Sequence, residues 1–189
     1  MGRSENHIRQ GGVPAPRAEG TATAPDHWRY ARHLDALAAA AGTAVGPEAD
    51  AVAAVLRDRD PVMAESAVVT HLGRRAARLL TDPGFPDWAR AMGAAIGTRA
   101  FPARRLREWT LLKEITHGEP WTAAELTAAS DWCQRTAVQS LTSFEALDLL
   151  AAAGRTRRVR NTAAQRLGRR TRPGLPTRPG VPTPPQLPG

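Results

Sequence analysis

The chain has 189 residues, and its 26 basic and 18 acidic side chains give a formal net charge of +8 at pH 7. Its single cysteine, Cys133, excludes a disulfide framework and a metal site of several thiolates. No run reaches the ~18 apolar residues of a membrane-spanning helix, and the N-terminus lacks the apolar core of a signal peptide, so we expect a cytoplasmic protein without a membrane partner. One lysine against 25 arginines, with abundant alanine, is typical of a GC-rich bacterial genome.

Composition divides the chain into three parts. Residues 1–24 contain no apolar run, and residues 169–189 are rich in proline and arginine. Neither segment has enough apolar side chains to offset the entropy lost on ordering, so we predict that both are disordered. The α-helical domain is expected over residues 26–168, which is long enough to bury a core.

The helices of the domain are marked by a capping residue or by a proline near the first helical position. Four starts of this kind precede residue 118, at Asp26, Pro47, Pro61 and Pro102, and a turn over residues 82–86 precedes a further helix. Apolar residues follow each start at helical spacing. In the longest helix the predicted inward stripe comprises Val62, Val69, Leu72, Ala76 and Leu79. No stretch alternates with the period of a strand, so the sequence predicts an all-α fold.

The stretch 121–168 specifies its helix starts most clearly. Thr122 and Glu125 have the spacing of a capping box, and Thr142 and Glu145 repeat it. Trp121 lies where a hydrophobic staple would close over such a start. We therefore expect Thr122 and Thr142 to be N-caps of short helices.

This stretch also contains an approximate repeat. Arg135, in Gln-Arg-Thr-Ala-Val, and Arg160, in Val-Arg-Asn-Thr-Ala, are separated by 25 residues, and the segment 142–151 lies between them. The pattern resembles that of the HEAT-like and leucine-rich-repeat-variant helical repeat proteins. The resemblance implies an α-solenoid, in which short antiparallel helix pairs stack side by side, with the clearest repeats in residues 121–168. The alternative is a helical bundle without repeats.

No catalytic or metal-binding motif is apparent. The five histidines never occur at i, i+4, and we interpret His71 as a packed or surface residue. The five tryptophans are interpreted as core and staple residues. A sub-family of HEAT-like proteins, the alkylpurine DNA glycosylases, lines a basic groove with tryptophan and aspartate, which Trp109, Asp131 and Trp132 resemble loosely. We nevertheless predict a non-catalytic protein without cofactor or metal.

The positive charge is concentrated at the C-terminal end. Nine arginines and no acidic residue follow Gly154, whereas the preceding part is close to neutral. The candidate polyanion-binding residues are Arg155, Arg157, Arg158, Arg160, Arg166, Arg169 and Arg170. Such residues would contact phosphates without reading sequence. The preferred hypothesis is a protein–protein interaction module or adaptor, and the alternative is a nucleic-acid-binding module that uses this end.

Overall fold

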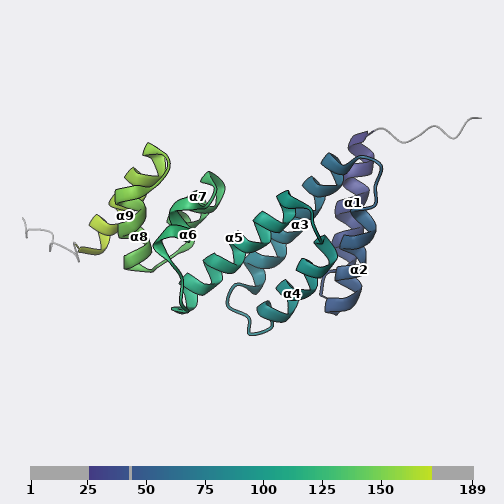
Figure 1. The fold of residues 1–189 in the computed structure, drawn as a ribbon, viewed down its shortest axis with the longest axis horizontal. Helices are drawn as coiled ribbons and strands as arrows, with labels where there is room; N and C mark the ends of the chain where they lie inside the picture. The colour runs from purple at the N-terminus through teal and green to yellow at the C-terminus, as the bar shows by residue number, and fades with distance from the viewer. Residues whose placement is uncertain (1–25, 43, 172–189) are drawn as a thin grey trace, which may run out of the picture.

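The computed structural model describes residues 26–42 and 44–171, and each regular element in these ranges is an α-helix (Figure 1). The prediction of an all-α fold is therefore confirmed. The two predicted disordered tails lie outside the described residues, except that residues 169–171 belong to the last helix, so the predicted start of the C-terminal tail at residue 169 is wrong. The helices are α1 Asp26–Ala40, α2 Val45–Val55, α3 Pro61–Leu79, α4 Phe85–Ile96, α5 Ala100–His117, α6 Ala123–Ala128, α7 Asp131–Ser140, α8 Phe144–Ala153 and α9 Arg157–Thr171.

The odd-numbered helices pack side by side, and the pairs α3–α5 and α7–α9 each run in the same direction. Arg99 at the start of α5 pairs with Glu65 near the start of α3, at 3.7 Å. His117 at the end of α5 bonds the Leu80 carbonyl oxygen just after α3, at 2.9 Å. α7 and α9 follow the same rule, because the Arg166 guanidinium donates to the Val138 carbonyl oxygen near the end of α7. Contacts of this kind link α1, α3, α5, α7 and α9 in succession.

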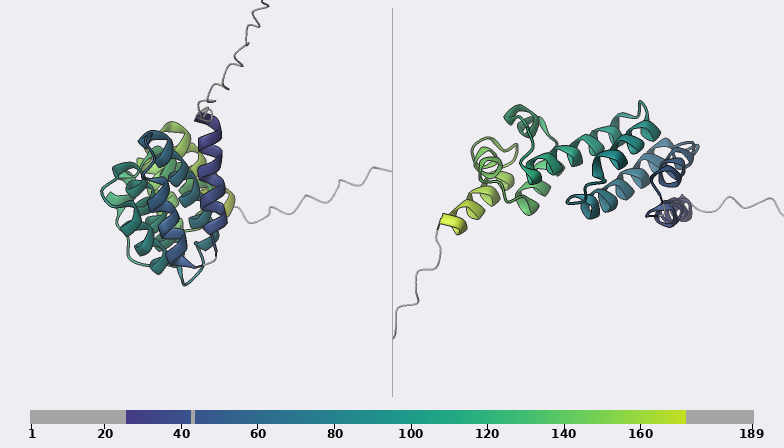
Figure 2. Two further views of the ribbon diagram at one scale, coloured as in Figure 1. Left: turned by 90° about the vertical axis from the view of Figure 1, so that its right-hand side faces the viewer. Right: turned by 90° about the horizontal axis from the view of Figure 1, so that it is seen from below.

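The even-numbered helices occupy the other layer. α2 packs against α4, and α6 packs against α8. The chain thus crosses from one layer to the other at each loop. Figure 2 shows the helices following one another along the long axis of the molecule. The buried apolar side chains form one continuous core, from Leu37 in α1 to Ala163 in α9.

Most helix ends follow from local sequence. Asp60 caps α3 by accepting a hydrogen bond from the Met63 N–H, and Ser130 caps α7 by accepting one from Cys133. Thr122 and Glu125 form the predicted capping box, with both reciprocal hydrogen bonds present. Gly118 ends α5 in the left-handed region, with φ of 71°, which favours glycine over residues with a Cβ.

The prediction that Thr142 is an N-cap is wrong. Ser143 caps α8, because its hydroxyl accepts the hydrogen bond of the Ala146 N–H, and Thr142 lies one residue before the cap. Glu145 is therefore in the first turn of α8 but does not complete a capping box with Thr142. The start of the helix is displaced by one residue because two adjacent hydroxyl residues compete for the same role.

Two of the residues that were predicted to pack inward are exposed instead. Val62 was predicted in the inward stripe of α3 but is 75% exposed, and Trp28 is 60% exposed. Val69, Leu72 and Ala76 of the same predicted stripe are buried. Val62 lies in the first turn of α3, next to the buried stripe, so helical spacing alone did not determine its burial.

One buried cluster of polar side chains joins α2, α3 and α4. The Glu48 carboxylate, which is 1% exposed, receives hydrogen bonds from the Trp88 indole at 3.0 Å and from the Arg75 guanidinium at 3.1 and 3.2 Å. His71 lies 2.8 Å from the same carboxylate, which confirms that it is a packed histidine. Burial alone would raise the pKa of Glu48, but these hydrogen bonds outweigh burial and lower the pKa below its ordinary value.

Replacing Thr122 by alanine is expected to lower the free energy of unfolding by about 1 kcal/mol, because the Glu125 backbone N–H loses its acceptor. The matched control is Thr127→Ala in the same helix, whose hydroxyl only donates to carbonyl oxygens of the preceding turn. We expect the control to stay within about 0.5 kcal/mol of the wild type in chemical denaturation. Equal losses in the two variants would show that the cap does not stabilise α6.

Candidate functional site

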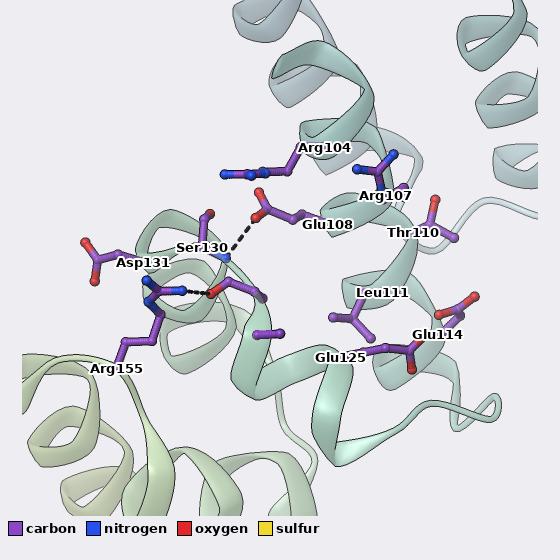
Figure 3. Close-up of a pocket in the computed structure, with 12 residues that line it drawn as sticks. Arg104, Arg107, Glu108, Thr110, Leu111, Glu114, Glu125, Ser130, Asp131 and Arg155 are labelled. Carbon is purple, nitrogen blue, oxygen red and sulfur yellow. Dashed lines mark hydrogen bonds between the residues drawn. The ribbon is translucent and has the colours of Figure 1, made fainter. Parts of the chain in front are cut away.

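A cleft of about 690 Å³ lies between α5 and the α6–α7 turn (Figure 3). One wall consists of successive turns of α5, and the other comprises the end of α6, the start of α7 and the α8–α9 loop. The volume is in the range of pockets that bind small molecules or short segments. The lining residues are Arg104, Arg107, Glu108, Thr110, Leu111, Glu114, Glu125, Ala128, Ala129, Ser130, Asp131 and Arg155.

The cleft arises from the lengths of the helices around it. α5 has 18 residues, but α6 has only 6 and is too short to cover it. α4 packs on α2 and α5, whereas α6 packs on α8. The even-numbered layer is therefore discontinuous beside α5, and the face of α5 that carries Arg104, Arg107 and Glu114 remains open.

The wall beside α7 is a packed junction of polar and aromatic side chains. Glu108, which is 6% exposed, accepts a hydrogen bond from the Ser130 N–H at 2.9 Å, where α7 begins. The Arg105 guanidinium stacks over the Trp132 ring, with 3.4 Å between its central carbon and the ring centroid. The Trp109 and Trp132 rings meet edge to face at 5.4 Å. These contacts hold α7 against α5 and fix the shape of the cleft.

This junction shows that the charged side chains of α5 are not all exposed to solvent. Glu108 is buried, and its second carboxylate oxygen lies 3.5 Å from the Arg105 guanidinium. Trp109 is buried against Trp132 rather than displayed in an open groove. The resemblance to the groove of the alkylpurine DNA glycosylases therefore has no support from these two rings.

The charged side chains that remain in the cleft are separated by sign. Arg104 and Arg107 are exposed on the first half of α5, and neither makes a hydrogen bond or ion pair with the described part of the chain. Glu114, in the last turn of α5, is half-buried and is likewise without such a partner among residues 26–42 and 44–171. Figure 3 shows the two arginines at one end of α5 and Glu114 at the other, next to Glu125.

Glu114 is held in an unfavourable environment. Burial raises its pKa, and the negative charges of Glu125 and Glu119 raise it further. The other carboxylates of the cleft are already bonded, since Asp131 pairs with Arg135 at 2.8 Å and Glu125 belongs to the α6 capping box. Glu114 is thus the carboxylate of this cleft that a positively charged partner would stabilise most.

We expect Glu114→Gln to leave the protein at least as stable as the wild type at pH 7. A raised carboxyl pKa means that the folded state binds the proton more tightly, so the free energy of unfolding falls as the pH rises above the ordinary value of 4.5. Glutamine removes this loss, and the variant should gain on the wild type between pH 4.5 and 7 in thermal unfolding. A variant that loses stability across this range would contradict the assignment.

The predicted polyanion-binding arginines are not brought together into one patch. Arg155 lines the cleft. Arg160 and Arg166 are half-buried and use their guanidinium groups inside the fold, because each donates at 2.7 Å to a backbone carbonyl oxygen, of Gly154 and Val138 respectively. The exposed members are Arg155, Arg157, Arg158 and Arg169, and the side chain of Arg170 lies outside the described residues.

The sequence-based prediction of site residues did not include Arg104, Arg107 or Glu114. The sequence did contain one indication of these residues. α5 carries arginines in its first half and a glutamate in its last turn, which is the opposite of the order that the helix dipole favours. Among the described residues, no group of three metal-binding side chains occurs. Within the same part of the chain, no helix is long and apolar enough to cross a membrane.

No protein-family model matches the chain, and neither a curated protein nor a solved structure matches it. The class of the site is therefore defined by its geometry: an open cleft on an all-helical protein, with uncommitted positive and negative side chains at its two ends.

Proposed function

We propose that this chain is a non-catalytic helical-repeat adaptor that binds another protein through the cleft beside α5. The proposed fold is an α-solenoid of the HEAT-like type. Its support is the alternation of the chain between two layers, with odd-numbered helices contacting odd-numbered ones and α2–α4 and α6–α8 contacting in the other layer. Stacked helix pairs of this kind expose extended surfaces that commonly bind other proteins.

The observation that carries the proposal is the open charged face of α5. Exposed charged side chains are usually solvated, but a cleft that leaves Arg104, Arg107 and Glu114 uncommitted offers both shape and charge to a partner. A protein segment can satisfy both signs at once.

The test is a pull-down with the full chain from native lysate, before and after nuclease treatment. The wild type is compared with a cleft variant, Arg104→Glu combined with Arg107→Glu, and with a matched control on α9, Arg157→Glu combined with Arg158→Glu. We expect a protein partner that survives nuclease, is lost with the cleft variant and is kept by the control. Circular dichroism of the variants checks the fold. Retention of nucleic acid alone would contradict the proposal.

Nucleic-acid binding through α9 is the second candidate, because Arg157, Arg158 and Arg169 are exposed and no acidic residue lies in that helix. If these side chains contact phosphates, the log of the affinity falls against log salt with a slope of about −0.7 to −0.9 for each contact. We expect only weak binding that disappears near physiological salt, where exposed charges are screened within about 8 Å. Tight, salt-resistant binding that changing the three arginines to glutamine abolishes would favour this function instead.

A further inference from the structure

Arg104, Arg107 and Glu114, the three charged side chains of the cleft without an intramolecular partner among the described residues, set a distance between positive and negative charge. Arg107 and Glu114 are seven residues apart on α5, and Arg104 and Glu114 are ten apart. At about 1.5 Å of rise per residue, the positive and negative groups are about 10–15 Å apart along the helix axis. They lie on the same open wall of a cleft of about 690 Å³, so one ligand can reach both.

The order of these charges is the reverse of what stabilises an isolated helix. A helix dipole favours acidic side chains near the N-terminus and basic ones near the C-terminus. In α5 the arginines precede, and Glu114 lies in the last turn beside two other carboxylates. Within the described residues, the Glu114 side chain forms no hydrogen bond or ion pair. Its negative charge therefore lowers the stability of the free protein, and a positively charged ligand group would remove this effect.

We propose that the cleft selects a protein segment with a basic side chain for Glu114 and an acidic side chain for Arg104 and Arg107, about 10–15 Å apart. This inference rests on the proposed function, because it specifies the partner of the same cleft. In an extended segment, at about 3.3 Å per residue, the two charges are three to five residues apart. In a helical segment they are seven to ten residues apart, the spacing of α5 itself.

The charge separation also fixes the direction of binding. The basic group lies toward the end of the cleft formed by Glu114 and Glu125, and the acidic group toward the first half of α5 (Figure 3). Exchanging the two charges in the ligand places like charges together at both ends, which costs affinity and gives selectivity. A segment with charge of one sign satisfies only one end.

The experiment selects binders of the full chain from a library of random 12-residue peptides displayed on phage. We expect enrichment of peptides with Lys or Arg and Asp or Glu at a separation of three to five or of seven to ten. A synthetic fluorescent peptide from this set is then titrated by anisotropy. Glu114→Gln should weaken binding about tenfold or more, the usual effect of losing one charge-assisted contact. Asp148→Asn, an exposed acid on α8 outside the cleft, is the matched control and should leave the affinity unchanged.

A double-mutant cycle identifies which charges meet. Replacing the basic residue of the peptide by glutamine should cause little further loss in Glu114→Gln, because the two changes remove the same contact. The corresponding result is expected for the acidic residue of the peptide and the Arg104→Gln, Arg107→Gln variant.

Any one of three outcomes would overturn the inference. The selection enriches no peptide, the enriched peptides lack the paired charges, or Glu114→Gln binds the peptide with the affinity of the wild type. A native protein partner that survives nuclease but does not depend on Glu114 would leave the adaptor function standing and refute the charge rule alone. Capture of no protein partner by the wild type would refute the proposed function itself, so the two failures are distinguishable.

Discussion

Replacing Glu48 by alanine is expected to lower the free energy of unfolding by about 3–5 kcal/mol, the usual effect of removing one member of a buried ion pair. The carboxylate is 1% exposed and bonds the Arg75 guanidinium and the Trp88 indole, with His71 at 2.8 Å. Without it, the partly buried Arg75 guanidinium and the buried Trp88 indole N–H lose their acceptor. Urea denaturation at pH 7 measures the loss.

The matched control is Asp87→Ala, because Asp87 forms an even shorter ion pair with Arg90, at 2.7 Å, but both side chains are 76% exposed. An exposed pair of this kind contributes at most about 1 kcal/mol. A loss in Glu48→Ala no larger than that of the control would show that the buried cluster does not hold α2, α3 and α4 together.

The effect of Glu48 is also expected to depend on pH. Its pKa is lowered in the folded state, so its contribution is complete above the ordinary value of 4.5 and is lost as the pH falls through the lower folded value. The difference in unfolding free energy between the wild type and Glu48→Ala should therefore shrink below pH 4.5.

The second large effect is expected at the α8–α9 interface, which is the most extensive contact between two of the described helices. Leu150 is fully buried there with Leu147 and Val159, while Leu167 is partly buried at its edge. Leu150→Ala is expected to lower the unfolding free energy by about 2–5 kcal/mol, through lost apolar burial and the cavity left behind. Phe144→Ala, on the same helix but 58% exposed, is the control and should change stability little. An unchanged melting temperature in Leu150→Ala would contradict the assignment of this packing face.

A substitution at Gly154 tests the same interface by adding an atom rather than removing atoms. Its backbone has φ of −59°, which any residue adopts, so it is not required for its conformation. A Cβ at this position would lie 2.5 Å from the Leu150 carbonyl oxygen and 2.7 Å from a Val159 methyl group. Gly154→Ala is therefore expected to cost about 1–3 kcal/mol by forcing α9 away from α8. A neutral result would mean that α9 moves without loss of packing.

The proposed function rests on charged side chains that make no stabilising contact within the described residues. The Glu48–Arg75 ion pair holds α2 to α3, and the Glu108 carboxylate holds α7 to α5 by accepting the Ser130 N–H, so substitution of either glutamate is expected to reduce stability as well as any activity. Arg104, Arg107 and Glu114 make no such contacts within the described residues. Variants at these three positions can therefore separate binding from folding.

The sequence by itself determined the class of fold and most helix ends, because these depend on residues within one turn of each other. A cap such as Thr122 bonds a residue three positions later. A glycine such as Gly118 ends a helix through its own positive φ, which does not depend on distant residues. The exception, Ser143 in place of Thr142, occurred where two adjacent hydroxyl residues satisfied the same local rule.

Tertiary structure alone decided which charges are buried and which face a cleft. Glu48 bonds residues 23, 27 and 40 positions away, and nothing near it in the sequence distinguishes it from a surface glutamate. The arginines of α5 look alike in sequence, yet Arg105 is stacked on Trp132 while Arg104 and Arg107 are open. This difference arises because α7 covers one side of α5 and the short α6 leaves another uncovered. Periodicity places side chains on a helix face, but only the packing of distant helices determines what that face meets.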